Sequence, residues 1–128
     1  MVGAMDTFED PMEIILWTRH ADGRWSARPL WMVLVGERAY VRSAFGRRSA
    51  WYRRVLEHAD TRIESASGRL RVALRPVGDA GLVQQVSDAY RAKYGLCWPG
   101  PVASINGPEA AAATLCLTEA GQVPQLPA

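Results

Sequence analysis

Glycine-containing turn signals separate short runs of strand-forming residues along most of this chain. Asp22-Gly23 follows the run EIILWTRH, Gly36-Glu37 follows SARPLWMVLV, and Gly68 divides two further runs. Tight turns of this kind join antiparallel neighbours, because a parallel connection needs a dozen residues or more. The pattern therefore predicts antiparallel strands over residues 13–20, 26–35, 38–45, 61–67 and 69–77, and the run ATLCLTE adds a sixth.

Two stretches have helical spacing instead. One apolar stripe begins after Ser49, a candidate N-cap, and consists of Trp51, Tyr52, Val55, Leu56 and Ala59. Residues 81–94 form a second amphipathic helix, which Gly95 is placed to end. CWPGP predicts a rigid loop, and Gly107-Pro108 predicts the start of a short helix.

The order of these elements is β-β-β-α-β-β-α-(short α)-β. Consecutive strands joined by hairpins imply an antiparallel sheet. Because the strands are partly apolar on both faces, a sheet closed into a barrel accounts for them best. The predicted fold class is α+β, mainly β: a small antiparallel barrel of about six strands with two packing helices. We expect it to span residues 13–119, with 1–12 as a lead-in and 120–128 as a loose tail.

The charge of the chain argues against one broad class of function. Its 128 residues carry a formal net charge of only +2, with 48% hydrophobic and 22% charged residues. A dedicated nucleic-acid binder usually has a whole basic face, so no nucleic-acid partner is expected. The first ten residues, MVGAMDTFED, lack the apolar core of a signal peptide, and no apolar run reaches the ~20 residues of a membrane span. These features predict a cytoplasmic protein without a membrane partner.

Cys97 and Cys116 are the only cysteines, and they lack the spacing of a structural zinc site. We expect two buried free thiols, and a disulfide between them stays open as an alternative. No cluster of metal-ligating residue types stands out, so no metal site is predicted.

The most distinctive stretch is YVRSAFGRRSAWYRRV, residues 40–55, in which five arginines surround one glycine and an aromatic pair. A strand that ends at a glycine turn and opens a helix gathers backbone N–H groups, hydroxyls and guanidinium groups, and that combination binds phosphate. We predict a cofactor phosphate there, with a tryptophan beside the cofactor ring. The predicted residues are Arg42, Ser43, Gly46, Arg47, Arg48, Ser49 and Trp51. Ion pairs on a solvated surface and contact with nucleic acid stay open as alternatives.

The segment ADGRWSARPLWMVLVGERAYVRSAFGRRSAWYRRVLEH resembles the small actinobacterial deazaflavin-dependent nitroreductases, within the pyridoxamine-phosphate-oxidase-like superfamily of split β-barrels. The matching positions are Arg28-Pro29-Leu30, Gly36, Tyr40, the turn from Ser43 to Gly46, Trp51-Tyr52 and Leu56. RSxxGxxxxWYRRV, with AYRAKYG downstream, looks most like an uncharacterised bacterial family, the domain of unknown function 2255. The resemblance covers roughly residues 13 to 118 and implies a split β-barrel.

Two departures separate this chain from the nitroreductases it resembles. Those proteins carry Asn-Leu after the Trp-Tyr pair, where this chain has Arg53-Arg54. The N-terminal hairpin also lacks their Gly-Arg-Lys-Ser-Gly run. The cofactor is therefore not fixed by the motifs alone, and deazaflavin, FMN and no cofactor all stay open.

The resemblance implies an oxidoreductase that uses FMN or a deazaflavin to reduce a small conjugated or nitroaromatic substrate. Tyr40 and Tyr52 are the candidate catalytic residues, and Trp17, Trp31 and Met32 are the candidate substrate-pocket residues. One alternative is a non-redox ligand- or cofactor-binding protein, and another is a cofactor-free enzyme acting on a hydrophobic metabolite in the barrel cleft. A homodimer also stays open, because five tryptophans in so short a chain hint at a shared apolar surface.

Overall fold

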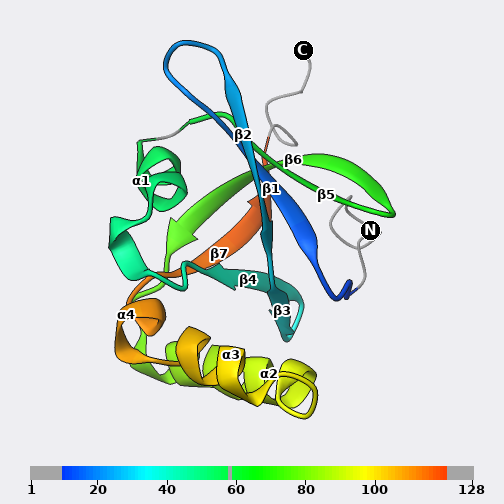
Figure 1. Cartoon of the computed structure of the whole chain (residues 1–128), viewed down its shortest axis with the longest axis vertical. Helices are drawn as coiled ribbons and strands as arrows, with labels where there is room; N and C mark the ends of the chain where they lie inside the picture. Colours follow the sequence, from blue (N-terminus) through cyan, green and yellow to red (C-terminus); the bar gives the residue numbers. More distant parts are fainter. Residues whose placement is uncertain (1–9, 58, 121–128) are drawn as a thin grey trace.

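The computed structural model describes residues 10–57 and 59–120 as a single curled sheet with helices packed against it (Figure 1). The seven strands are β1 (Ile14–Arg19), β2 (Trp25–Leu30), β3 (Met32–Val35), β4 (Arg38–Arg42), β5 (Thr61–Ser65), β6 (Gly68–Pro76) and β7 (Thr114–Glu119). The helices are α1 (Ala50–Leu56), α2 (Ala80–Tyr94), α3 (Pro99–Ile105) and α4 (Pro108–Ala111), with a 3-10 turn, η2 (Gly46–Arg48), before α1. The predicted mainly-β split barrel is confirmed, with seven strands where about six were expected.

The sheet closes because its two edge strands are consecutive in the chain. Its strand order is β2-β1-β5-β6-β7-β4-β3, and every neighbouring pair is antiparallel. Only Trp31 separates β2 from β3. A sheet whose outermost strands are joined by one residue has to curl until its edges meet at that residue, as Figure 1 shows. The barrel is therefore closed at Trp31 by the covalent chain rather than by ladder hydrogen bonds.

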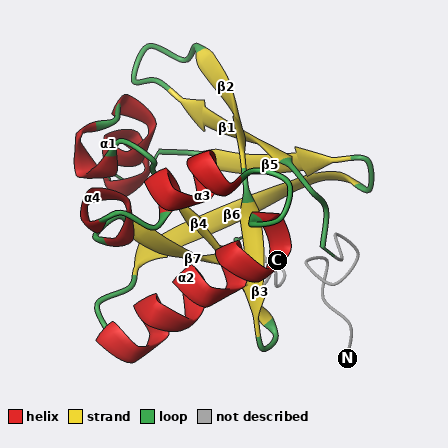
Figure 2. Ribbon diagram, turned by 60° about the horizontal axis from the view of Figure 1, so that its bottom comes forward, coloured by secondary structure: helices red, strands yellow, loops and turns green. Residues whose placement is uncertain are grey.

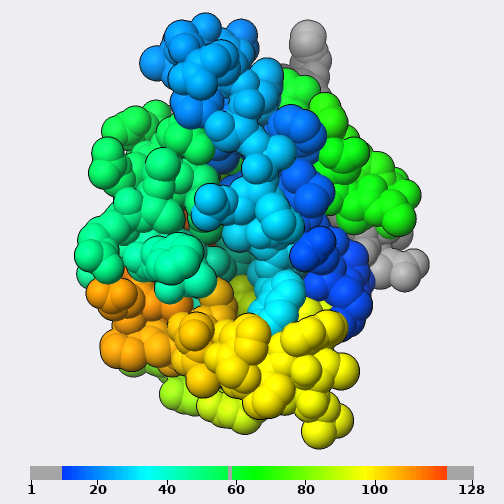
Figure 3. Space-filling view, in the orientation of Figure 1, coloured from blue at the N-terminus to red at the C-terminus, as the bar shows by residue number. Residues whose placement is uncertain are grey.

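The single strand predicted over residues 26–35 is two strands, β2 and β3, separated at Trp31. Met32 and Val33 of β3 are buried, whereas Ala27, Arg28 and Pro29 of β2 are exposed. Proline has no N–H to donate, which suits an edge strand such as β2. Figure 3 shows this segment, in light blue, on the molecular surface.

The alternation predicted for the strand at residues 38–45 is confirmed within β4. Ala39 and Val41 face the barrel interior, where they pack with α1. Tyr40 faces the opposite way, toward a second cluster beneath α2 and α3. These two helices lie side by side across one end of the barrel (Figure 2). Trp51, Tyr52 and Val55 of α1 are buried as predicted, but Leu56 is 40% exposed and Ala59 lies beyond the end of the helix.

Two details of the segment after α2 correct the sequence interpretation. CWPGP is not a loop throughout, because α3 begins at Pro99, with proline in the first helical turn. Cys97 is exposed rather than buried, and Cys116 is half-buried; both are free thiols. Gly95 follows α2 as predicted, but a side chain there would collide with the Arg91 carbonyl oxygen, so close packing rather than a left-handed backbone requires glycine.

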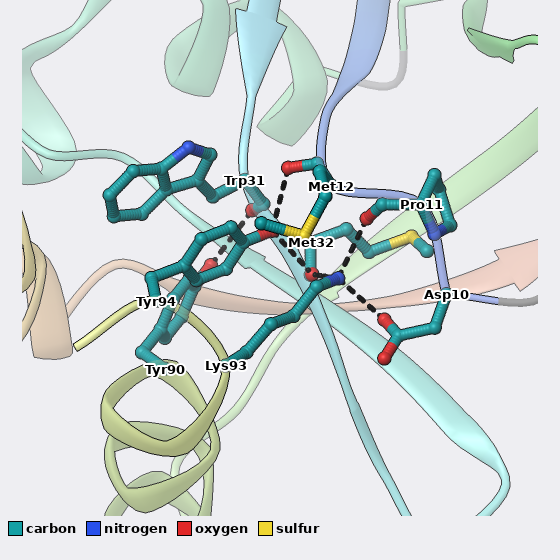
Figure 4. A network of polar contacts seen from close by, with 8 residues as sticks. All are labelled: Asp10, Pro11, Met12, Trp31, Met32, Tyr90, Lys93 and Tyr94. Carbon is teal, nitrogen blue, oxygen red and sulfur yellow. Dashed lines mark hydrogen bonds and ion pairs between the residues drawn. The ribbon is translucent and has the colours of Figure 1, made fainter. Parts of the chain in front are cut away.

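The last turn of α2 is fastened to the N-terminal segment by the only lysine of the chain (Figure 4). Lys93 Nζ donates hydrogen bonds to an Asp10 carboxylate oxygen at 2.5 Å and to the carbonyl oxygens of Pro11 and Met32, each at 2.7 Å. An ammonium group has three donors, and all three are used here. Arginine, with its planar fork, does not have this three-way geometry.

Two tyrosines of α2 add further hydrogen bonds to the N-terminal segment and to the connection between β2 and β3 (Figure 4). The Tyr90 hydroxyl donates to the carbonyl oxygen of Trp31 at 3.0 Å. The Tyr94 hydroxyl lies 2.8 Å from the carbonyl oxygen of Met12 and 3.2 Å from that of Met32. The motif AYRAKYG is thus the means by which α2 holds the point where β2 becomes β3.

We expect Lys93→Met to lower the free energy of unfolding by about 2 kcal/mol, because two carbonyl groups and the Asp10 carboxylate lose a charged donor. Urea denaturation measures this loss. The matched control is Arg91→Met on the same helix, whose side chain is 61% exposed and paired only with Asp88. The control should change the free energy by less than about 0.5 kcal/mol. Equal losses in both variants would show that this network adds nothing to stability.

Candidate functional site

A cavity of about 760 Å³ lies between β2, the loop that follows β4, and α3. This volume falls within the range of small-molecule sites, roughly 300–1,000 Å³. Figure 3 shows the three bordering segments meeting on one face: β2 in light blue, the segment after β4 in cyan-green and α3 in gold. The lining includes Arg28, Leu30, Trp31, Arg42, Ser43, Phe45, Trp51 and Ile105, and one carboxylate, that of Glu13.

A second, smaller cavity of about 190 Å³ borders the first and shares Ala27, Arg28 and Trp51 with it. Its polar lining includes Arg54, whose Nε donates to the buried Thr18 hydroxyl at 2.9 Å. No aspartate or glutamate is among the described residues that line it. The two cavities therefore form a cleft along the inner face of β2 that carries positive charge at the Arg28 and Arg54 side.

Arg42, a predicted phosphate ligand, is 1% exposed and forms part of the wall of the larger cavity. Its Nε donates to the Thr114 hydroxyl at 2.8 Å, and its Nη2 donates to the carbonyl oxygen of Val83 at 2.8 Å. Its Nη1 donates both to the carbonyl oxygen of Ile105 and to the side-chain oxygen of Asn106. Four of the five guanidinium donors thus have internal partners, which tie β4 to β7, α2 and α3.

The charge of Arg42 has no carboxylate partner among the described residues. All four of its hydrogen-bond acceptors are neutral, and the ring of Tyr90 lies 5.5 Å from the guanidinium carbon. Burial lowers the pKa of the guanidinium, because desolvation disfavours the charged form. A buried cation without a counter-charge favours an anion nearby. The cavity wall at Arg42 is therefore suited to an anionic ligand.

The turn between β4 and α1 is held together by its own hydroxyl groups. Ser43 Oγ and Ser49 Oγ lie 2.5 Å apart, and Ser49 occupies the N-cap position of α1 without a capping hydrogen bond from its side chain. Gly46 has a φ of +76°, and a side chain there would press on Glu109. Of the predicted turn residues, only Ser43 reaches the cavity with Arg42; Gly46 and Ser49 do not line it.

Arg47 and Arg48 are exposed on the surface. Arg48 forms an exposed ion pair with Glu109 at 3.4 Å. Such a pair contributes less than about 1 kcal/mol. Neither arginine lines the larger or the smaller cavity.

The structure brings two of the predicted aromatic residues to the cavity and leaves two predicted pocket residues elsewhere. Trp31 and Trp51 line the larger cavity, and Trp31 stacks on Tyr94 with ring centroids 4.0 Å apart. Met32 is buried in the core beneath α1. Trp17 faces the opposite side of the sheet, where its indole N–H donates to Glu64 at 2.8 Å.

Tyr40 and Tyr52, the candidate catalytic residues, are 3% and 2% exposed and do not line the larger cavity. Burial raises the pKa of both phenols above the ordinary value. Burial likewise raises the pKa of Tyr90 and Tyr94. The hydroxyl groups of all four tyrosines therefore hold their protons more strongly than a free phenol does.

Arg28 is the site residue that the sequence interpretation did not single out. It lines both cavities and is exposed, and its side chain forms no hydrogen bond or ion pair with a described residue. It shares one face of β2 with Ser26 and Leu30, because side chains alternate along a strand. That period-two spacing, together with its place in the Arg-Pro-Leu segment, is the signal that could have identified it.

Two absences within residues 10–57 and 59–120 bear on the type of site. No group of three or more histidine, cysteine, aspartate or glutamate side chains gathers there to hold a metal ion. No helix in these ranges has the length and apolar character needed to cross a membrane.

Solved structures with the same fold come from several protein classes. ChuZ of Campylobacter jejuni is 14% identical with a TM-score of 0.66, over 89% of this chain and 49% of its own, so this chain spans about half its length. A Listeria innocua protein named after pyridoxamine 5′-phosphate oxidase is 10% identical with a TM-score of 0.61, over 91% and 90%. An F420-H2-dependent reductase is 12% identical with a TM-score of 0.60, over 85% and 96%. Comparison with curated proteins finds no match.

These likenesses establish the fold of the pyridoxamine-phosphate-oxidase-like split barrels. A family of uncharacterised proteins conserved in bacteria, the domain of unknown function 2255, matches residues 4–117. Because this match covers most of the chain, the chain belongs to that family.

The raised tyrosine pKa values predict that the folded protein titrates above the ordinary phenol value of about 10. Ultraviolet absorbance should show less tyrosinate in the folded protein at pH 10.5 than in concentrated urea, where the titration should have a midpoint near 10. Since the folded pKa values are the higher ones, this contribution to stability is complete below about pH 10 and declines as the pH rises further. Urea midpoints at pH 9 and pH 11 check the sign. A normal phenol titration of the folded protein would contradict the burial of these side chains.

Proposed function

We propose that this member of the domain of unknown function 2255 family binds a flavin or a deazaflavin in the cleft beside β2. The observation that carries the proposal is the composition of the cleft, which has indole and aliphatic walls and contains cations without carboxylate partners. Arg42 supplies a buried positive charge, and Arg28 supplies an exposed one with no described partner. A ligand with a planar ring and an anionic group complements both features.

The residues present fit such a group. The ring would lie against Trp31 and Trp51, and its anionic substituent would accept hydrogen bonds from Arg28, from the Ser43 hydroxyl and from the remaining N–H of Arg42. A role as phosphate ligands stays a prediction for four residues that do not line the cavity: Gly46, Arg47, Arg48 and Ser49. Their part is tested separately by Arg47→Gln.

A reduced flavin or deazaflavin would supply hydride to a small conjugated substrate, and nitroaromatic compounds are the first class to assay. The chain itself would contribute binding, orientation and the exclusion of water. Phe45, which is 68% exposed at the cavity, would cover the substrate side. The proton donor is not assigned, because the hydroxyl groups of Tyr40 and Tyr52 are buried away from the lining.

The first test is an absorbance spectrum of the purified protein, followed by thermal melts with FMN, a deazaflavin and haem in separate samples. A ligand at 100 times its dissociation constant should stabilise the fold by about 2.7 kcal/mol, which raises the melting temperature by several degrees. Stabilisation without turnover would favour the non-redox binding protein. A protein indifferent to all three would contradict the proposal and favour a cofactor-free enzyme.

We expect Arg28→Gln to weaken cofactor binding about tenfold, because one charge-assisted hydrogen bond is lost. The melting temperature without cofactor should not change, since Arg28 has no described partner to lose. Fluorescence titration with the cofactor measures the affinity. Arg24→Gln is the matched control, because Arg24 is exposed on the neighbouring hairpin and lines neither cavity. Equal affinities for the two variants would remove Arg28 from the site.

We also propose that two copies of the chain associate over the face that carries β2 and the cavity mouth. This edge strand is exposed along most of its length, and Phe45 and Trp98 are among the exposed apolar residues. Sedimentation velocity should therefore give the mass of a dimer at micromolar concentration.

Phe45→Asp should shift the protein toward monomer, because a charge would be placed in the apolar contact. Leu34→Asp on β3, where Leu34 is 39% exposed, is the matched control and should leave the sedimentation pattern unchanged. A monomer at every concentration would contradict this association.

A further inference from the structure

A second cluster of aromatic and cationic side chains lies on the sheet face opposite the cleft. Trp17 alternates along β1 with Leu16 and Thr18, which line the smaller inner cavity, so its indole faces outward. The register places Trp17 beside Arg62 of β5 and Arg62 beside Arg71 of β6. A groove of about 180 Å³ opens on this face, lined by Trp17, Trp25, Arg62 and Arg69.

Arginines and indoles contact each other face to face in this groove. The Arg62 guanidinium carbon lies 5.1 Å from the ring centroid of Trp25, and that of Arg19 lies 5.9 Å from the same ring. The Arg69 guanidinium carbon lies 4.9 Å from the ring of Trp17. Trp25 remains 37% exposed. Cation–π contacts of this kind keep the guanidinium groups close to the indole rings.

Two carboxylates orient these groups without cancelling their charge. Glu64 accepts from the Trp17 indole N–H at 2.8 Å and from Arg69 at 3.2 Å. Asp60 accepts from Arg62 at 3.4 Å and 3.3 Å, and Arg71 lies 3.6 Å from the same carboxylate. Arg62 and Arg69 line the groove, and Arg19 and Arg71 lie beside it. Together these four arginines and the two carboxylates carry two more positive than negative charges.

We propose that this groove, on the outer face of β1, β2, β5 and β6, binds a nucleotide, either free or within a single strand. A base can stack on an exposed indole, and its phosphate can accept paired hydrogen bonds from a guanidinium group. An acidic peptide offers the charge without the planar ring. A neutral sugar offers a stacking face without the charge. The near-neutral charge of the whole chain is compatible with this inference, because the excess is confined to one groove.

The site is independent of the proposed cofactor cleft, since the two occupy opposite faces of the sheet and share no lining residue. The test titrates the cofactor-free full chain with a fluorescent single strand of about twelve nucleotides and, separately, with AMP, both at low salt. Binding of the strand alone identifies a single-stranded partner. Binding of AMP as well identifies a free nucleotide as sufficient. Either result supports the proposal.

Arg62→Gln with Arg69→Gln should weaken binding at least about tenfold and flatten its salt dependence, because two phosphate-pairing groups are removed. The matched control is Arg24→Gln with Arg91→Gln, which removes the same charge from two exposed arginines that are each paired with one carboxylate. It should weaken binding less than about threefold. Arg62→Lys with Arg69→Lys keeps the charge and loses the planar fork, so it should also weaken binding.

Trp25→Leu removes a stacking surface from an exposed position and should weaken binding roughly tenfold without unfolding the protein. Thermal melts of each variant confirm that it is folded. Failure of the wild-type protein to bind either ligand would overturn the proposal. So would equal losses in the double variant and its control, or binding of poly-glutamate as tight as that of the single strand, because both would indicate unspecific attraction of anions.

Discussion

The one-residue connection at Trp31 is the constraint on which the rest of this molecule depends. Because β2 and β3 are consecutive, the chain has to pass from one edge of the sheet to the other within a single peptide unit. No ladder of hydrogen bonds joins the two edges, so other elements have to stabilise the crossing. Helix α2 does so through the hydroxyl of Tyr90 on the Trp31 carbonyl, and through Lys93 and Tyr94 on the Met32 carbonyl.

This crossing also explains where the cleft lies. Beyond Trp31 the strand β3 is covered by α2, whereas β2 leaves the body of the molecule paired only with β1. The space between β2 and α3 is therefore not filled by a neighbouring strand, and the larger cavity occupies it. Arg42 stands at the inner end of this space because β4 places it on the face toward α2 and α3, where neutral acceptors hold it.

Local features of the fold were predictable from the sequence, and features that depend on closure were not. The hairpins at Asp22-Gly23 and at Gly68, the alternation in β4 and the helices α1 and α2 follow from neighbouring residues and their periods. The break at Trp31 does not, since residues 31–35 are apolar enough to continue the strand and only the curl of the sheet interrupts them. Helix α3 was missed for a related reason: the prolines and glycine of CWPGP disfavour a helix interior but are compatible with its first turn.

The candidate site shows the same division between residue type and environment. The sequence identified arginines near a glycine turn as an anion site, and the structure buries one of them, Arg42, in the cavity wall while leaving Arg47 and Arg48 on the surface. A guanidinium group at the end of a strand looks the same in sequence whether it faces solvent, a carboxylate or a set of backbone carbonyls. Its value for binding depends on those partners: Arg48 is already neutralised by Glu109, whereas Arg42 is held by neutral oxygens alone. Because a buried charge without a counter-ion is costly, the arginine that the fold surrounds most completely is also the one with the most to gain from an anionic ligand.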